Sequence, residues 1–143
     1  MIEGYLALVA AAAFTGIAFY INAVEQPARL ALGDAAALRQ WVAAYRRGFI
    51  LMAGLTVTGA LFGAAAFGSE GDWHWLAGAV LLIANWPYTH IGVAPTNQRL
   101  LATAEAAAGG DTRRLIENWG QLHMVRTGLG ALATLVFFWA AIT

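Results

Sequence analysis

The start of the last apolar stretch of the chain carries residue types that can do chemistry together. Trp119, His123 and Arg126 stand at i, i+4 and i+7, so one helical face presents an aromatic ring, an imidazole and a guanidinium. The chain contains no cysteine, which excludes a thiolate metal site and a cysteine nucleophile. Redox or metal chemistry therefore has to use His, Glu, Tyr or Asn side chains, or a bound cofactor.

More polar residues lie near the ends of the other apolar stretches. Pro27, Pro87 and Pro95 remove backbone hydrogen bonds there, and broken helix at membrane depth is tolerated only where protein or a wet cavity satisfies it. Polar side chains at such depth face the bundle interior or a cavity, and they mark functional sites by default. The sequence therefore predicts a polar pocket open to the inner leaflet, lined by Asn22, Glu25, Tyr45, His90, Asn97, Trp119, His123 and Arg126.

Several of these residues also have simpler explanations. Arg126 can lie at the membrane interface as a topology signal, as Arg46 and Arg47 are expected to do. Glu25 can pair with Arg29, and His90 can bond to a carbonyl that a proline has freed. The set His90, His123 and Glu25 has suitable metal-ligand types, although no close His-x-x-x-His motif supports a metal site. Two histidines on different spans can also ligate haem.

The composition shows which elements must position these side chains. The chain is 60% hydrophobic and 11% charged, with a mean hydropathy of +0.63, whereas soluble domains average about 25% charged residues. The net charge of +0 argues against nucleic acid as a partner. Crossing a hydrocarbon core takes roughly 20 apolar residues. We therefore expect one all-α domain, an integral membrane four-helix bundle in the lipid bilayer, with spans at about 4–24, 48–69, 75–98 and 119–142.

The placement of charge predicts the orientation of these spans. All eight basic residues are arginines, and they lie between spans one and two, between spans three and four, or at the entrance to span four. The connection between spans two and three carries only the acids Glu70 and Asp72. The positive-inside rule then places both termini outside, in what we expect to be a bacterial inner membrane. Tryptophans are expected in interfacial belts, with Trp73, Trp75 and Trp139 at the outer side and Trp41 and Trp119 at the inner side.

The two arginine-bearing connections contain the starts of long helices. Caps near Gly33-Asp34 and Gly110-Asp111-Thr112 precede amphipathic stretches that run into the next span without a break, which predicts helices over about 34–68 and 112–142. An offset of 78 residues pairs Trp41 with Trp119 and Tyr45 with His123. This pairing indicates a diverged parallel repeat, whose axis would run along the membrane normal with any shared cavity on it.

Glycines in spans two and four predict close helix packing. Gly59-x-x-x-Gly63 in span two has the spacing that lets two backbones approach in lipid, where apolar surface alone gives no drive for association. Packing within the bundle is the ordinary use of such glycines. The same pair also makes an oligomer through Gly59 and Gly63 a possible use.

Two segments of the chain resemble a known family. The residues Val93 to Leu100, VAPTNQRL, are followed about twenty residues later by Trp119 to Thr127, WGQLHMVRT. Together they resemble the signature of a family of small four-span membrane proteins that includes the fungal and bacterial anthrone oxygenases. The family's pattern of an Asn after a proline, a Trp, and a His and Arg leading the last span maps onto Asn97, Trp119, His123 and Arg126.

The resemblance implies an activity and roles for the residues. Anthrone oxygenases convert a tricyclic polyphenolic anthrone and O2 to an anthraquinone without a dedicated cofactor. His123 would then be the base, Arg126 would hold the phenolate or enolate oxygen, Asn97 would orient a carbonyl, and Trp119 would stack on the ring. His90 or Glu25 would relay the proton, and the substrate would be a hydrophobic aromatic molecule arriving through lipid. A haem- or metal-bearing quinol or porphyrin oxidase, and a non-enzymatic small-molecule binder or membrane assembly partner, remain the alternatives.

Overall fold

The computed structural model describes residues 1–143 and consists of helices and short connections, without strands. Four helical stretches are long and apolar enough to cross a membrane: Ile2–Leu30, Asp34–Glu70, Trp73–Ala102 and Gly110–Ile142. The second and fourth are the single helices α3 (Asp34–Glu70) and α7 (Gly110–Ile142), which confirms the two long helices predicted from the caps. The all-helical four-span class is likewise confirmed.

The first and third stretches are each interrupted by one wide helical turn. The first consists of α1 (Ile2–Tyr20), the π-helical turn η1 (Ile21–Glu25) and α2 (Gln26–Leu30). The third consists of α4 (Trp73–Ile83), α5 (Asn85–Tyr88), the π-helical turn η2 (Thr89–Val93) and α6 (Ala94–Ala102). A short 3-10 turn, η3 (Glu105–Ala107), precedes α7. The sequence analysis did not predict either π turn.

Each π turn ends two residues before a proline. Pro27 and Pro95 are each the second residue of the helix that follows η1 or η2. A proline within a helix lacks the N–H that would bond to the preceding turn, and a π turn accommodates one extra residue at such a place. Because the same device recurs in the first and third stretches, it supports the parallel repeat that the sequence suggested.

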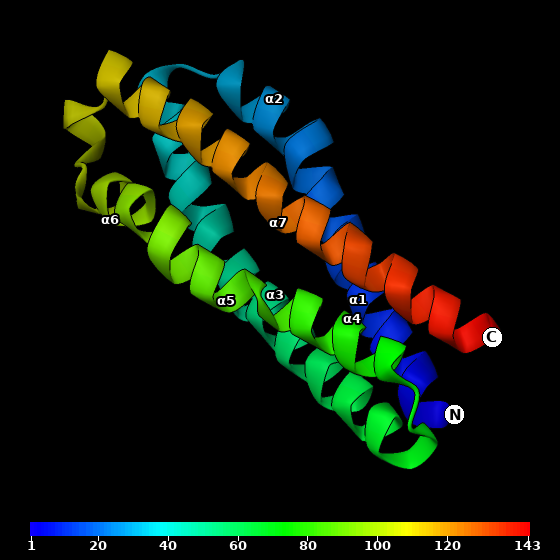
Figure 1. Cartoon of the computed structure of the whole chain (residues 1–143). Helices are drawn as coiled ribbons and strands as arrows, with labels where there is room; N and C mark the ends of the chain where they lie inside the picture. The colour runs from blue at the N-terminus through cyan, green and yellow to red at the C-terminus, as the bar shows by residue number, and fades with distance from the viewer.

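The helices form a ring in which neighbours in the ring pack closely. α1 lies against α3 and α7, and α4 lies against the same two helices from the other side. The two chain ends lie together at one end of the bundle, and the connections that follow α2 and α6 lie at the other (Figure 1). We call the first end the terminal half and the second the arginine half, since most of the arginines lie in the parts of the helices near that second end.

The terminal half is a tightly packed apolar core. Phe137 of α7 is fully buried, and its ring inserts between Gly63 of α3 and Gly78 of α4. A Cβ on Gly63 would lie 2.8 Å from the Cζ atom of Phe137, and a Cβ on Gly59 would lie 2.5 Å from Cδ2 of Leu82. Gly59 and Gly63 therefore pack against side chains of the same chain, and an oligomer through these two glycines stays a prediction.

The arginine half has a smaller core built around two tryptophans. Trp41 is 0% exposed and Trp119 is 6% exposed, and their rings meet edge to face with centroids 5.8 Å apart. The belt predicted for Trp41 and Trp119 is therefore wrong, because both rings pack against each other inside the bundle. Trp75 is also buried, under Gly4, whereas Trp73 and Trp139 are exposed as expected.

Hydrogen bonds from polar side chains stabilise helix ends on both sides of the bundle. Arg113 of α7 donates to Asp34 Oδ1 at 2.6 Å and to the carbonyls of Leu30 and Leu32 at 2.8 and 2.6 Å, which ties both arginine-bearing connections together. At the other end, Gly71 ends α3 with φ of 73°, and the Asp72 carboxylate accepts the backbone N–H of His74 at 3.0 Å. This backbone bond is the main reason why the pKa of Asp72 lies below its usual range.

Candidate functional site

The main cavity lies in the arginine half, between α1, α3, η2, α6 and α7. Its volume is about 140 Å³, and the cavity is open at one side. An apolar cavity of about 150 Å³ can hold one benzene ring. Most of the wall is apolar, and the polar groups on it come from all four membrane-length stretches: Glu25, Arg29, Tyr45, Thr89, Asn97, His123 and Arg126.

His123 is the most deeply buried titratable side chain on this wall, with 1% of its surface exposed. Its Nδ1 lies 2.9 Å from the side-chain oxygen of Asn22 in η1. Its Nε2 is buried and has no hydrogen-bond partner. One ring nitrogen is thus held by the protein, and the other is free for a bound molecule.

Arg126 lies one turn further along α7 and separates two cavities. Its side chain belongs to none of the ion pairs of the chain, and its Nε is buried without a partner. The guanidinium lies over the ring of Phe14, 5.8 Å from the ring centroid, which is a cation–π distance. A buried guanidinium without a carboxylate partner favours an anion, because five N–H donors are available to it.

Glu25 and Arg29 form the far wall of the main cavity as an ion pair. Arg29 also donates to Gln40 and to Gln26, and its guanidinium lies 5.4 Å from the centroid of the Trp119 ring. Gln40 donates to Glu25 Oε1 at 3.1 Å. The pairing of Glu25 with Arg29, the simpler explanation from the sequence, is therefore present, and the carboxylate is already engaged by two donors.

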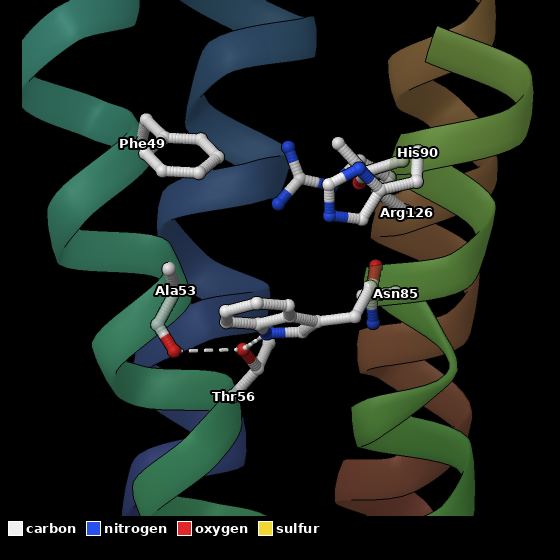
Figure 2. A pocket seen from close by; sticks show the side chains of 8 residues that line it. Phe49, Ala53, Thr56, Asn85, His90 and Arg126 are labelled. Carbon is white, nitrogen blue, oxygen red and sulfur yellow. Dashed lines mark hydrogen bonds between the residues drawn. The ribbon is translucent and has the colours of Figure 1, made fainter. Parts of the chain in front are cut away.

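A second, smaller cavity adjoins the first. It has a volume of about 30 Å³ and is lined by residues of α3, α5, η2 and α7: Phe49, Ala53, Thr56, Asn85, Trp86, Thr89, His90 and Arg126. Figure 2 shows Arg126 reaching between α3 and the α5–η2 segment, with His90 beside it. The indole N–H of Trp86 donates to the Thr56 hydroxyl at 2.9 Å. Phe49, Thr89 and Arg126 line both cavities and so form the partition between them.

Buried polar atoms without a partner are confined to these two cavities. The structure has six such side-chain atoms, and every one belongs to a residue of a cavity wall: Trp41 Nε1, Asn85 Oδ1, Thr89 Oγ1, Asn97 Oδ1, His123 Nε2 and Arg126 Nε. Buried polar groups in folded proteins are nearly always hydrogen-bonded, so a cluster of exceptions needs an explanation. A bound molecule with hydroxyl or carbonyl groups in the main cavity would explain the unpaired atoms of Trp41, Asn97 and His123.

The structure brings together six of the eight residues that the sequence predicted for one pocket. Glu25, Tyr45, Asn97, Trp119, His123 and Arg126 line the main cavity. His90 lines the second cavity instead, at its exposed rim. Asn22 lines neither cavity, because its amide is turned toward α7. The alternative metal set is not assembled, since no three His, Cys, Asp or Glu side chains lie where they could hold one ion.

The sequence analysis missed several residues of the site. Trp41 was expected at the interface but lines the main cavity with an unpaired indole N–H. Thr127 donates to the same Asn22 oxygen that His123 contacts, at 2.8 Å. Tyr88 donates to the Leu122 carbonyl at 2.8 Å and so anchors the α5–η2 segment to α7. The pairing of Trp41 with Trp119 in the repeat was the signal that could have revealed the first of these.

Comparison with known proteins assigns the chain to a family. The model of a family described as anthrone oxygenase matches residues 41–136, about two thirds of the chain. The chain belongs to the anthrone oxygenase family. Among curated relatives, anthrone oxygenase tpcL of Aspergillus fumigatus is 33% identical over 132 residues, covering 85% of this chain and 81% of the relative. An anthrone oxygenase of Claviceps purpurea is 29% identical over 147 residues, covering 93% of this chain and 84% of the relative.

The matched region includes most of the cavity wall. Residues 41–136 contain Trp41, Tyr45, Asn97, His123 and Arg126, together with all of the second cavity. The η1 segment, with Asn22 and Glu25, lies before the region that the family model covers. No solved structure matches the chain. The anthrone oxygenase family thus has a four-span bundle in this member, with two adjoining cavities in the arginine half.

Proposed function

We propose that the chain is a membrane-bound oxygenase that oxidises electron-rich polyphenolic aromatics of the anthrone class with O2, without a resident cofactor. The observation that carries the proposal is the unpaired Nε2 of His123 next to the unpaired Arg126 on the wall of a cavity that has room for one ring of the substrate and opens at a mouth where the other rings would lie. The family and the names of its relatives supply the substrate class. The cavity chemistry supplies a role for each residue.

His123 acts as the general base. The methylene group of an anthrone is flanked by two aryl rings, so removal of one proton gives a delocalised carbanion whose charge rests largely on the carbonyl oxygen. Imidazole is the side chain that most often carries out proton transfer of this kind in enzymes. The free Nε2 receives the proton.

Arg126 stabilises the anion that this step produces. Its guanidinium binds the enolate oxygen and so lowers the free energy of the transition state in which charge moves onto that oxygen. The unpaired atom of Asn97 is its side-chain oxygen, which can only accept a hydrogen bond. Asn97 therefore binds a phenolic hydroxyl of the substrate, where the sequence analysis had it orient a carbonyl.

The remaining steps need only O2. The carbanion gives one electron to O2, and the resulting carbon radical and superoxide combine, so that a C–O bond forms. The proton on His123 passes to the peroxide. Loss of the second methylene proton then breaks the O–O bond, so that a C=O group forms and water leaves. The methylene carbon loses four electrons, one oxygen atom enters the quinone and the other becomes water, and the equation balances without another reductant or oxidant.

We also propose how the protein lies in the membrane. The arginine half faces the cytoplasm, as the positive-inside rule requires, so that the main cavity lies near the inner leaflet. A hydrophobic aromatic substrate then reaches it from lipid. The bacterial inner membrane is the location we infer, although both relatives named above are fungal.

The proposal is tested with purified protein in lipid nanodiscs supplied with an anthrone. We expect O2 consumption with formation of the anthraquinone, and a loss of about 10²- to 10⁴-fold in kcat for His123→Gln, the range typical of a general base. His74→Gln is the matched control, because His74 lies at the opposite end of the bundle and bonds only to Asp72.

Three outcomes would contradict the proposal. A wild-type rate in His123→Gln would show that His123 is not the general base. Tight binding of the anthrone without O2 consumption makes the chain a binding protein. A haem absorption band or stoichiometric metal in the active preparation would contradict cofactor-free chemistry. It would favour the haem- or metal-bearing oxidase, for which His90 and His123 are the candidate ligands.

A further inference from the structure

The side chain of Asn22 makes three hydrogen bonds, and all of them go to α7. Its Nδ2 donates to the carbonyl of Gly120 at 2.9 Å. Its Oδ1 accepts from the Thr127 hydroxyl at 2.8 Å and lies 2.9 Å from His123 Nδ1. A backbone carbonyl can only accept, so the amide nitrogen of Asn22 has to face Gly120 and the amide oxygen has to face His123.

This orientation determines where the proton of His123 lies. An amide oxygen can only accept, so the 2.9 Å contact is a hydrogen bond only if Nδ1 of His123 carries the hydrogen. In the neutral ring, the lone pair is then on Nε2, a buried atom without a partner in a residue that lines the main cavity. With the opposite tautomer, two lone pairs would face each other at Asn22 and a hydrogen would occupy the position that a base needs free.

The backbone at Gly120 permits this contact. A Cβ on Gly120 would lie 2.6 Å from Nε2 of Gln26, so a side chain there would push the α2 segment away. Gln26 donates to the Ile116 carbonyl at 2.7 Å, one turn from the bond between Asn22 and Gly120. Two successive amide-to-carbonyl bonds thus dock the first membrane-length stretch on α7.

We propose that Asn22 is a positioning residue that fixes His123 as the Nδ1–H tautomer with its Nε2 lone pair toward the cavity. The tautomer itself does not depend on the proposed function. The effect of the tautomer on turnover rests on the proposed function. Asn22 acts through His123 and makes no contact with the cavity, so it holds the base without an added charge.

The test combines a spectroscopic measurement with kinetics. In ¹⁵N-His-labelled protein at neutral pH, we expect the His123 signals of a protonated Nδ1 and an unprotonated Nε2. In Asn22→Leu, the ring should become a mixture of tautomers, with kcat lower by about 10- to 100-fold and KM little changed. Asn22→Asp keeps an acceptor at the same place and should restore the Nδ1–H tautomer.

Thr15→Val is the matched control. Thr15 and Thr134 join the same two membrane-length stretches, the first and the fourth, by a side-chain bond of 3.0 Å in the terminal half, away from His123. A protonated Nε2 in the wild type, or an unchanged tautomer and rate in Asn22→Leu, overturns the proposal. If the wild type shows the Nδ1–H tautomer but consumes no O2 with any anthrone, the positioning stands and the proposed function fails.

A second inference rests on the smaller cavity. Asn85 is 1% exposed, and its Oδ1 is unpaired, as are Thr89 Oγ1 and Arg126 Nε on the same wall. A buried water needs roughly 10–15 Å³ and two to four polar partners. The volume of about 30 Å³ and these three atoms meet both conditions, whereas an aromatic molecule does not fit.

We infer that this cavity binds water at membrane depth. Since it shares Arg126 and Thr89 with the main cavity, it gives the water formed in each turnover a route past the bound aromatic. Exposed His90 lies at the rim of this route, in the gap between α3 and the α5–η2 segment (Figure 2).

X-ray radiolytic labelling tests this inference, because it marks side chains that lie next to bound water. In nanodiscs, we expect several-fold stronger labelling of Phe49 and Trp86 than of Phe19 and Phe138, which are exposed on the bundle surface but line neither of the two cavities. Asn85→Leu should abolish the difference. Equal labelling of the four aromatics in the wild type would overturn the inference.

Discussion

The terminal and arginine halves are built from the same four membrane-length stretches, but their side chains pack differently. In the terminal half, glycines and alanines let large rings such as Phe14 and Phe137 fill the space between helices. In the arginine half, bulky Trp41 and Trp119 meet at the centre, and cavities remain beside them. All six unpaired buried polar atoms line those cavities. The comparison indicates that close packing in the terminal half stabilises the bundle, so that unpaired polar groups are tolerated in the arginine half.

Among the changes that separate the two halves, the largest effect is expected for Arg126. Replacement by Gln should lower kcat by about 10²- to 10³-fold, as loss of one oxyanion donor does elsewhere. The unfolding temperature should stay the same or rise, because the change removes a buried cation without a partner. Steady-state kinetics and thermal unfolding of the same sample measure both. A large fall in stability would show that Arg126 holds the bundle together, and the contrast between the halves would fail.

Phe137→Ala is the converse change in the terminal half. The unfolded helices remain in lipid, so the loss is chiefly the cavity term, about 24 cal/mol per Å³, or about 2 kcal/mol for roughly 100 Å³ removed. Thermal or SDS-induced unfolding would measure the loss. The kcat of the folded fraction should match that of the wild type. A kcat that falls as far as in Arg126→Gln would mean that the two halves are not separable.

Gly63→Ala adds one methyl group against Phe137 and should cost about 1 kcal/mol, the lower end of the range for overpacking. Gly54→Ala is the matched control on the same helix, because no atom lies within 4 Å of a Cβ placed there. The difference in unfolding free energy between the two variants is the measurement. Equal stability would show that the terminal half is less tightly packed than its geometry indicates.

The smallest effect is expected at the Asp72 cap. The bond from the His74 backbone N–H lowers the pKa of this carboxyl in the folded state. The stabilisation is therefore present above the unfolded-state pKa and is lost as the pH falls through the lowered folded-state value. Between about pH 5 and about pH 2, the wild type should lose slightly more stability than Asp72→Asn, which caps the helix without titrating. Parallel pH curves would contradict this.

The sequence predicted the long elements well because their signals are local. The caps at Gly33 and Gly109–Thr112 and the unbroken apolar runs fix α3 and α7 almost to the residue. His123, Arg126 and Asn97 could be grouped because proline and helical spacing place polar side chains at similar depth. The depth of a residue in the membrane, however, does not say toward which helix its side chain points, and His90 lines the second cavity instead of the first.

What could not be predicted depends on contacts between helices. The role of Asn22 requires the Gly120 carbonyl, 98 residues away along the chain. Trp41 was expected at the interface because, in the sequence, a tryptophan of an interfacial belt looks the same as a buried one. Only the contact with the Trp119 ring shows that Trp41 is buried. The π turns leave no simple pattern in a single sequence, although the prolines that follow them gave an indirect sign.

Those π turns have a consequence for how members of the family should be compared. Each one lodges an additional residue in a continuous helix, so removal of one residue from Ile21–Glu25 would turn the preceding α1 by roughly 100° relative to α2. Single-residue gaps in alignments are therefore expected to be tolerated in the connections and to be strongly selected against, or matched by loss of the π turn, at 21–25 and 89–93. A homologue with such a gap would present a different helix face to the cavity and is a natural candidate for altered substrate choice.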